Sequence, residues 1–555
     1  MRDAKQQRQA LLAVASGAGY AIAWPGYEQW LLAWVCFVPL LWVLDDPGLG
    51  KARALGFSWV AGLTAHVLGY TWLIGMLRDF GHLPLPLAVL GFFLVCLGQS
   101  SLFGAWGLLT WVVSQRLRVP LVWTAPVTMV VIEWLYPALF PSYFANSQYR
   151  QLVVIQSVDI WGVLGVGFIL ALSSAVIYQV LAWLVRGRGQ MPLASGITFV
   201  VLVAFDIVYG AAALSNIDDT VAVAPKKIRV GMVQTNMGIY DKTQRPSEGL
   251  RRHREQSLEV ERQGAELIIW PESGFYYPIR EGTTNVAGQV LGPISTPLIF
   301  GGLRVAKSES GEREVWNTAF MTDAGGNILG TYDKTYLLAF GEYLPFGDWF
   351  PLLYELSPNT SKFNRGAHTK PFEYDGVKYG ILICYEDLLP RFVSKVMESE
   401  PDVLVNITND AWFGASREPL IHLAMAIFRS IEHRRFLARS TNTGISAFVD
   451  PAGRILDETP VFARANTMHD VAALQGRTIY SRIGDLAGWL CLALVLYWFR
   501  PMFKTAYRKI RRLPAQLTEP RSPAPSSGLD DPDGSSPTPS SRPGLRRPRR
   551  DLRRR

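Results

Sequence analysis

The sequence contains few cysteines, and this limits the role that each of them can play. Only four of its 555 residues are cysteines. Cys36, Cys96 and Cys491 lie in long apolar segments, so Cys384 is the one cysteine of the more polar part of the chain. A structural disulfide there would need a partner on the same side of the molecule, and none is available. Cys384 is therefore either a buried apolar residue or a reactive thiol.

The sequence also shows no motif typical of a metal site or of a nucleotide-binding site. The seven histidines show no spacing typical of a metal site, and His422 and His433 fall on a predicted helix where a core or solvated role is the default. No glycine-rich phosphate loop lies between a strand and a helix. We therefore expect neither a metal nor another cofactor.

Charged residues are scarce, at 18% of the chain, although the formal net charge is +9. Much of the excess comes from residues 542–555, where no aromatic residues are interleaved with the arginines. Nucleic-acid binding is therefore not expected. The segment 513–555 is rich in Pro, Ser, Asp and Arg, which predicts a disordered, basic, cytoplasmic tail.

Apolar residues are abundant instead, at 49% of the chain, and they concentrate in the first 215 residues and in one late segment. A bilayer core requires about 17 to 25 apolar residues per helix. Eight segments come close to that length, and we predict them as membrane spans: Ala10–Trp24, Trp30–Leu44, Leu55–Leu77, Leu85–Val113, Leu121–Leu139, Val153–Val185, Leu193–Leu214 and Ile483–Phe499.

Basic residues at the ends of the spans predict the orientation, because Lys and Arg are retained on the cytoplasmic side. Arg78 and Arg150 are the main exceptions to the alternation. The amino terminus is thus predicted inside and the region after the seventh span outside. Basic residues lie before the first span and after the second, fourth, sixth and last spans: Arg2, Lys5, Arg8; Lys51, Arg53; Arg116, Arg118; Arg186, Arg188; and Arg500, Lys504.

Four parts of the chain follow from these patterns. Residues 1–215 form a membrane domain with seven spans, 226–476 a catalytic domain, 483–500 the last span and 513–555 the tail. Within 226–476 short apolar runs alternate with helical patterns, as in an α/β domain with a buried sheet. The predicted strands are Ile228–Gln234, Leu267–Trp270, Leu298–Leu303, Thr318–Thr322, Gly380–Cys384, Val403–Ile407 and Ser446–Val449, and the predicted helices are Ser247–Gln263, Leu389–Glu398 and Pro419–Leu437.

Three ends of predicted strands carry reactive side chains, and loops at strand ends are where α/β domains place their chemistry. Glu272 lies in Trp-Pro-Glu-Ser (270–273), Lys334 in Tyr-Asp-Lys-Thr-Tyr (332–336), and Cys384 in Ile-Leu-Ile-Cys-Tyr-Glu-Asp (381–387). A thiol needs a base to become a nucleophile and a cation or amides to hold an oxyanion. The carboxylate and the lysine therefore favour the reactive interpretation of Cys384.

A carboxylate, a lysine and a cysteine at separate strand ends resemble the nitrilase (carbon-nitrogen hydrolase) superfamily over about residues 227–450. Phe-Gly-Glu-Tyr-Leu-Pro (340–345) and Asn-Asp-Ala-Trp-Phe-Gly (409–414) extend the match in the same order. Within that superfamily, a nitrilase domain between membrane spans is similar to the apolipoprotein N-acyltransferase branch, and Arg-Ser-Thr-Asn-Thr-Gly-Ile-Ser (439–446) also looks like it. The resemblance implies an extracytoplasmic αββα sandwich on a multi-pass helical bundle.

By that resemblance, a phospholipid donates an acyl chain to the α-amino group of a diacylglyceryl-modified lipoprotein, through a thioacyl intermediate on Cys384. Glu272 would be the general base, Lys334 would stabilise the oxyanion and Glu342 would orient Lys334. The alternative for Glu342 is a surface carboxylate on a loop. The resemblance also implies a location among membrane lipids in the bacterial inner membrane, with the catalytic domain on the periplasmic side. We expect a monomer, because nothing in the sequence requires more than one chain.

Four further residues are candidates for supporting roles. Tyr385 and Glu386 flank the nucleophile and are expected to shape the pocket rather than to react. Trp412 and Phe413 could hold an acyl chain or cover the cleft, and a plain packing role is the alternative. The loop 337–353 is rich in Leu, Phe, Tyr and Trp, and we expect it to reach toward the acyl chains through Phe346 or Trp349.

Two other functions remain open at this point. A membrane-tethered amidase or nitrilase would use the same three residues with water as the second nucleophile. A catalytically silent receptor or transporter subunit would use the fold for binding alone. The complete set Glu272, Lys334 and Cys384 argues against the silent protein, as does the scarcity of charge within the spans.

Overall fold

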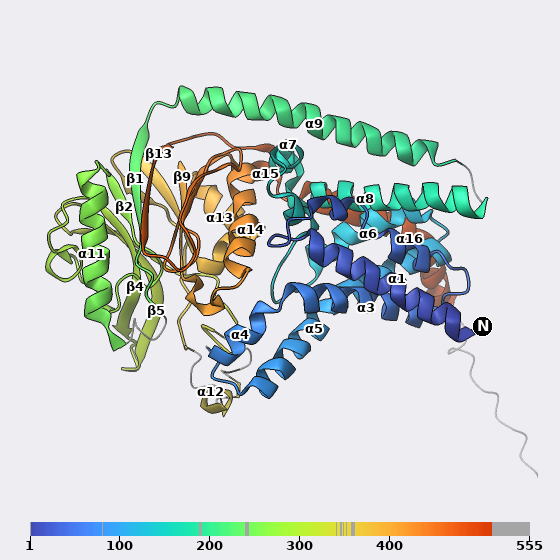
Figure 1. Ribbon diagram of the computed structural model, residues 1–555, viewed down its shortest axis with the longest axis horizontal. Helices are drawn as coiled ribbons and strands as arrows, with labels where there is room; N and C mark the ends of the chain where they lie inside the picture. The colour runs from blue at the N-terminus through green and yellow to red at the C-terminus, as the bar shows by residue number, and fades with distance from the viewer. Residues whose placement is uncertain are drawn as a thin grey trace, which may run out of the picture. The chain divides into compact units, whose positions relative to one another are not determined.

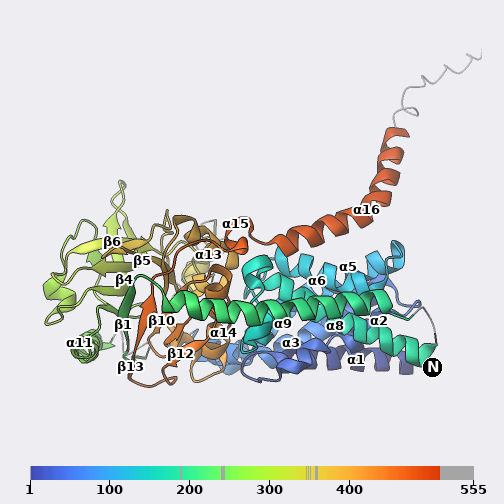
Figure 2. The same cartoon turned by 90° about the horizontal axis from the view of Figure 1, so that it is seen from above.

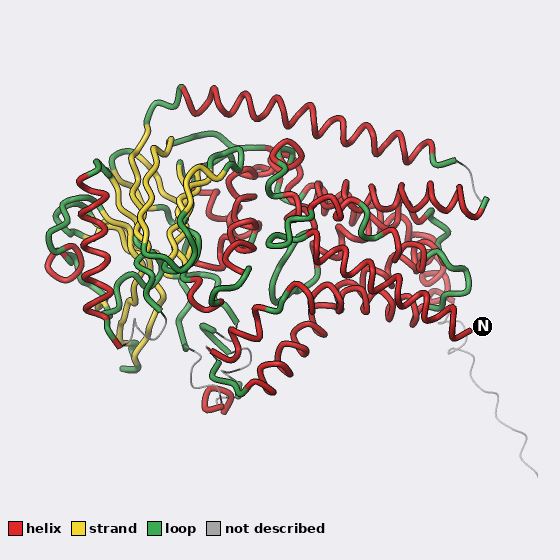
Figure 3. Tube along the Cα trace, in the orientation of Figure 1, coloured by secondary structure: helices red, strands yellow, loops and turns green. Residues whose placement is uncertain are grey.

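The computed structural model describes residues 2–512, apart from residues 80, 188–190, 239–243, 340, 345, 346, 348, 351 and 357–360. The chain divides into two units, one ending at Arg500 and the other beginning at Pro501. The first unit contains a helical region and a two-sheet domain, which Figure 3 separates by colour. Of the second unit, only the last helical turns up to Arg512 are described, and the predicted tail 513–555 lies outside the described residues.

Helices cover every predicted span. The long α9 lies alongside α8 in Figure 2 and leads into the first strand of the sheet domain. The helices of this region are α1 (Arg2–Ala23), α2 (Val38–Leu44), α3 (Lys51–Gly69), α4 (Trp72–Asp79), α5 (Leu85–Trp111), α6 (Leu121–Leu135), α7 (Leu152–Ile155), α8 (Val158–Arg186), α9 (Leu193–Ala222) and α16 (Leu486–Arg512).

Fewer helices than predicted are long and apolar enough to cross a bilayer. Among the described residues there are four such helices, or five when α3 and α4 count as one broken span. The segment Leu55–Leu77, predicted as one span, is divided between α3 and α4, which meet at a 61° bend. The apolar helix Leu121–Leu135 is short: 15 residues rise roughly 22 Å, less than the ~30 Å of a bilayer core. The count of eight spans therefore stays a prediction.

The sheet domain consists of two sheets whose inner faces pack together (Figure 1). One has seven strands in the order β13-β1-β2-β4-β5-β6 with β3 beside β4, and the other has six in the order β12-β11-β10-β9-β8-β7. The strands are β1 (Lys227–Gln234), β2 (Leu267–Ile269), β3 (Ile279–Arg280), β4 (Leu298–Lys307), β5 (Arg313–Thr322), β6 (Ile328–Asp333), β7 (Phe372–Tyr374), β8 (Val377–Ile383), β9 (Val403–Thr408), β10 (Phe436–Thr441), β11 (Ala447–Val449), β12 (Ile455–Glu458) and β13 (Ala465–Ala472).

Helices cover both outer faces of this sandwich, as an αββα arrangement requires. Helix α11 (Pro246–Arg262) packs on β1, while α13 (Pro390–Val396) and α14 (Glu418–His433) pack on the second sheet. The short helices α12 (Leu352–Leu356) and α15 (Ile479–Ile483) lie in connections. The central strands β2 and β9 are entirely buried, which explains their continuous apolar runs.

One predicted helix is too long, and the error hid a strand. The helix predicted over Pro419–Leu437 ends at His433, where Arg434 takes a left-handed conformation with φ of +51°. Phe436 then begins β10, which pairs in parallel with β9. The apolar spacing of Phe436 and Leu437 continues the helical pattern, so the sequence does not reveal the break.

Hydrogen bonds join the sheet domain directly to the helical region within the first unit. The guanidinium of Arg434 donates to Asp159 Oδ2 at 2.6 Å and to Gln156 Oε1 at 2.6 Å. The Gln156 side chain also donates to the carbonyl of Ala452 at 2.9 Å. The start of α8 is therefore fixed against the end of α14.

Candidate active site

Three strand ends bring Glu272, Lys334 and Cys384 into one buried cluster. Glu272 follows β2, Lys334 follows β6 and Cys384 follows β8. Lys334 Nζ lies 3.6 Å from Glu272 Oε1, and both groups act electrostatically on the thiol. Between 1% and 8% of each residue is exposed. The fold therefore brings together the three residues that were predicted from separate sequence motifs.

Glu342 and Asn317 complete this cluster. Both carboxylate oxygens of Glu342 lie 2.9 Å from Lys334 Nζ, and one of them accepts the N–H of Leu338. Asn317 on β5 donates from Nδ2 to Glu272 at 2.6 Å and to Glu342 at 2.9 Å. Glu342 is thus not a surface carboxylate. Asn317 was not predicted as a site residue, because it is a polar residue within a strand and belongs to none of the motifs.

The backbone of Cys384 has a left-handed conformation, with φ of +53°. Such a conformation costs a non-glycine residue about 1 to 2 kcal/mol, so its surroundings must hold it. It ends β8 at Ile383, one residue earlier than predicted, and turns the thiol out of the strand. Thr408, at the end of the neighbouring β9, faces the thiol with its hydroxyl.

Glu386 joins the loop that carries Cys384 to the loop that carries Lys334 by hydrogen bonds. One of its carboxylate oxygens accepts the N–H groups of Thr335 and Tyr336, at 2.8 and 2.9 Å. The other accepts the N–H of Ile383 at 2.8 Å. The hydroxyl of Tyr332 donates to the same carboxylate. Burial raises the pKa of Glu386 to about 7, although these donors oppose the shift. Glu386 therefore shapes the site without facing the reacting groups.

Burial and charge set the protonation of the central groups. Burial raises the pKa of the Cys384 thiol well above its usual range, and the negative charge of Glu272 raises it further while Lys334 opposes the shift. Burial tends to lower the pKa of Lys334, but the charges of Glu342 and Glu272 outweigh it and the pKa is raised. The resting site therefore holds a neutral thiol, a fixed ammonium and a carboxylate beside them.

Such an arrangement suits nucleophilic attack by the thiol on a carbonyl carbon. A carboxylate beside a protonated thiol can take its proton as the bond forms. A rigid ammonium can stabilise the oxyanion that develops, which is worth about 3 to 4 kcal/mol for a preorganised donor.

The remaining predicted residues face the helical region. The hydroxyl of Tyr385 donates to the carbonyl of Leu139 at 2.9 Å, and its ring stacks on Tyr336. Phe413 meets Trp72 of α4 edge to face, with ring centroids 5.2 Å apart. Trp412 and Phe413 are half-buried. Phe413 therefore has at least the packing role considered from the sequence.

One group among the described residues could offer three metal-ligand atoms: Asp410, Glu418 and His422. The guanidinium of Arg439 already contacts Asp410, with N–H to Oδ2 at 3.3 Å. His422 places Nδ1 3.2 Å from Asp410 and Nε2 2.9 Å from Asp387. Burial raises the pKa of Glu418 to about 8. The donors are thus engaged with protons and a guanidinium, and a solvated role for His422 is wrong.

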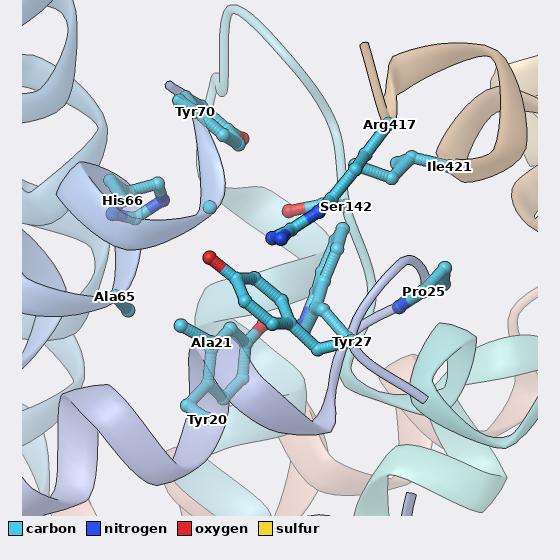
Figure 4. Close-up of a pocket in the computed structure, with 12 residues that line it drawn as sticks. Tyr20, Ala21, Pro25, Tyr27, Ala65, His66, Tyr70, Ser142, Arg417 and Ile421 are labelled. Carbon is cyan, nitrogen blue, oxygen red and sulfur yellow. The ribbon is translucent and has the colours of Figure 1, made fainter. Parts of the chain in front are cut away.

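Two of the cavities among the described residues differ greatly in size. Figure 4 shows the smaller one, between α1, α3 and the start of α14, with Arg417 reaching over the ring of Tyr27 at 3.8 Å. Its interior of about 30 Å³ has room for about one water molecule. The larger cavity measures about 640 Å³ and borders Leu337, Tyr343 and Trp349, beside the segment that carries Glu342. Only the larger one could admit part of a substrate.

Known protein families match both the helical region and the sheet domain of the chain. Residues 16–176 match the family model described as apolipoprotein N-acyltransferase N-terminal domain, and residues 229–474 match carbon-nitrogen hydrolase. The apolipoprotein N-acyltransferase of Geobacter metallireducens is 30% identical over 512 residues, which are 88% of this chain and 94% of that protein. The enzyme of the same name from Bdellovibrio bacteriovorus is 29% identical over 87% of this chain and 92% of that protein.

Among solved structures, a mutant of the amidase from Nesterenkonia sp. AN1 is 19% identical, with a TM-score of 0.33, over 47% of this chain and 96% of that chain. The match to the Geobacter protein extends over nearly the whole length of both chains. It includes the helical region as well as the sandwich that carries Glu272, Lys334 and Cys384. The chain belongs to the apolipoprotein N-acyltransferase family.

Proposed function

We propose that the protein transfers a fatty acyl chain from a membrane phospholipid to the α-amino group of the diacylglyceryl-cysteine of lipoproteins, the last step of their maturation. Family membership supports this acyl transfer. The observation that carries the mechanism is the buried thiol of Cys384 beside one carboxylate and one ammonium. We also infer that Cys384 holds the acyl group as a thioester between two half-reactions.

In the first half-reaction, Glu272 takes the proton of the Cys384 thiol as the sulfur attacks the ester carbonyl of the phospholipid. Lys334, with backbone N–H groups near Tyr385, stabilises the resulting oxyanion. The tetrahedral intermediate then expels the alkoxide of the lysophospholipid, which takes the proton from Glu272. The enzyme is left as a thioester with its carboxylate free to act again.

In the second half-reaction, the amine of the lipoprotein attacks the thioester carbonyl. Glu272 accepts a proton from the attacking nitrogen, and the thiolate leaves and recovers that proton. An amide forms and the free enzyme returns. The two substrates thus react in turn at one site, so ping-pong kinetics are expected.

The supporting residues are assigned from their contacts. Glu342 holds Lys334 in place, since both of its carboxylate oxygens reach Nζ. Glu386 keeps the lysine and cysteine loops in register. Tyr385 anchors the cysteine loop against the helical region. Phe413, which contacts Trp72 of α4, and its neighbour Trp412 are proposed to line the approach to the site.

A bilayer location accounts for the large helical region. Both substrates are held in a membrane, so an active site at its surface meets them at high effective concentration. We propose the bacterial inner membrane, with residues 1–215 and 483–500 spanning it, residues 226–476 on the periplasmic side, and a monomer as the working form. The helices long and apolar enough to cross a bilayer support this location.

The loop 337–353 is proposed to reach the lipid surface. Trp349, Phe350 and Leu352 are 76%, 61% and 62% exposed, whereas Phe346 lies outside the described residues. We expect Trp349→Ser to raise the KM for phospholipid vesicles about tenfold, because an exposed indole would lose its burial among acyl chains. Leu329→Ser, on β6, is the control. Unchanged phospholipid turnover in Trp349→Ser would count against contact between this loop and lipid.

Acyl transfer itself is tested with the purified protein, a phospholipid and a synthetic diacylglyceryl-cysteine peptide, with the peptide followed by mass. The wild type should add one fatty acyl group to the peptide amine, and Cys384→Ala should add none. Lys378→Met, which changes an exposed lysine on β8, should keep the activity. Hydrolysis of a small amide without acylation of the peptide would instead favour a membrane-tethered amidase.

Alkylation of Cys384 by iodoacetamide separates the roles of Glu272 and Lys334. Since the charge of Glu272 raises the pKa of the thiol and that of Lys334 lowers it, Glu272→Gln should speed alkylation at pH 8 and Lys334→Met should slow it. Both variants should nevertheless lose about 10²-fold or more in acyl transfer, because each lacks a group that acts in the transition state.

Peptide mapping identifies the alkylated cysteine, and Lys378→Met again serves as the control. Two results would contradict these roles. One is a shift of the alkylation rate in the same direction for Glu272→Gln and Lys334→Met. The other is normal acyl transfer by Glu272→Gln.

A further inference from the structure

The main-chain carbonyl of Cys384 accepts a hydrogen bond from a side chain that does not belong to the cluster of Glu272, Lys334 and Cys384. Asn406, in the middle of β9, donates from Nδ2 to the carbonyl oxygen of Cys384 at 3.2 Å and to that of Leu382 at 3.4 Å. A main-chain carbonyl only accepts hydrogen bonds, so the amide nitrogen of Asn406 must face it. This contact lies at the residue whose backbone is left-handed.

Arg439 fixes the other end of the Asn406 side chain. Its guanidinium, on the adjacent β10, donates to Asn406 Oδ1 at 2.9 Å. Arginine only donates, so its position determines the amide orientation of Asn406. The same nitrogen of Arg439 donates to Asp387 at 2.6 Å, and its second terminal nitrogen donates to Asp410 at 3.3 Å.

His422 closes the network on the side of α14. One ring nitrogen faces Asp387 and the other faces Asp410, at 2.9 and 3.2 Å. Burial and Arg439 tend to lower the pKa of His422, but the two aspartates raise it to about 9. Two carboxylates are thus balanced by one guanidinium and one imidazolium.

Burial makes the whole assembly rigid and keeps it apart from solvent. The side chains of Arg439, Asp387 and Asp410 are fully buried, and that of His422 is 2% exposed. Buried ion clusters have few alternative arrangements, because breaking a contact between their charges leaves an unpaired charge. Asn406 is also fully buried, and its side-chain oxygen accepts a hydrogen bond from Arg439.

We propose that Asn406 and Arg439 are positioning residues that hold Cys384 in its left-handed conformation, with its thiol aimed at Glu272 and Lys334. Asp387, Asp410 and His422 act through Arg439 by fixing its guanidinium. The inference rests on the proposed function in one respect, the role of Cys384 as nucleophile. None of the five residues contacts substrate in this scheme.

Asn406→Asp is the sharpest test. An aspartate keeps an oxygen for Arg439 but cannot donate to the carbonyl of Cys384. We expect the rate of Cys384 thioacylation at saturating phospholipid to fall roughly tenfold to a hundredfold, with an unchanged KM, because a misplaced nucleophile reacts slowly even when substrate is bound. Alkylation of Cys384 by iodoacetamide should change as well.

Arg435→Met is the matched control. Arg435 is also fully buried, and its N–H groups donate to main-chain carbonyls, including those of Pro401 and Gly476. This variant should lose thermal stability while keeping its rate per folded molecule. Arg439→Met should lose both stability and rate, and His422→Gln should show a smaller loss of rate.

Three outcomes would support or overturn the positioning role proposed for Asn406. A lower rate in Asn406→Asp at an unchanged KM, with altered alkylation of Cys384, supports the proposal. A rate and an alkylation profile equal to wild type overturn it, as does a loss in Asn406→Asp that merely follows the folded fraction, as in Arg435→Met. If the wild type forms no thioester with phospholipid, the proposed donor is wrong, and the alkylation comparison still tests the positioning.

Discussion

The site depends on one buried ammonium held between two carboxylates. Lys334 sits between Glu342 and Glu272 and is almost completely removed from water. Burying a single charge costs several kcal/mol, and only close partners with further hydrogen bonds can offset that cost. Asn317 supplies such bonds to both carboxylates. Two negative charges and one positive charge favour a proton on the neighbouring thiol, which is the resting state that a general base requires.

Helix α14 links this chemistry to the helical region. Near its start it carries His422, which belongs to the ion cluster behind Cys384. At its end Arg434 bonds to Gln156 and Asp159 of the helical region. Tyr385 makes a second connection through Leu139. The loop that carries Cys384 is therefore held by contacts within the sandwich and by one contact with the helical region.

Much of the site could be predicted because its residues lie in short motifs at strand ends. Glu272 and Cys384 follow apolar runs that form parallel strands, and the ends of such strands meet at one edge of a sheet. Lys334, after the antiparallel β6, and Glu342 were predicted from their motifs instead. Asn317 and Asn406 could not be found in this way, since both lie within strands and matter only through their neighbours. Arg439 was noted only as part of a family motif. Its strand, β10, was not predicted, because the predicted helix extended over the first residues of that strand.

Other features depend on backbone geometry that spacing does not encode. The break at Arg434 and the turn at Cys384 both use left-handed residues other than glycine, for which composition gives no signal. The bend between α3 and α4 likewise interrupts a continuous apolar run, which is why one straight span was predicted there.

The intact mass of the purified protein, after incubation with phospholipid and no acceptor, tests the central claim most directly. The wild type should gain one fatty acyl group that hydroxylamine removes, whereas Cys384→Ala should gain none and Cys384→Ser no hydroxylamine-labile group. A wild type that gains no mass with any phospholipid, while it hydrolyses a small amide, would contradict acyl transfer through Cys384.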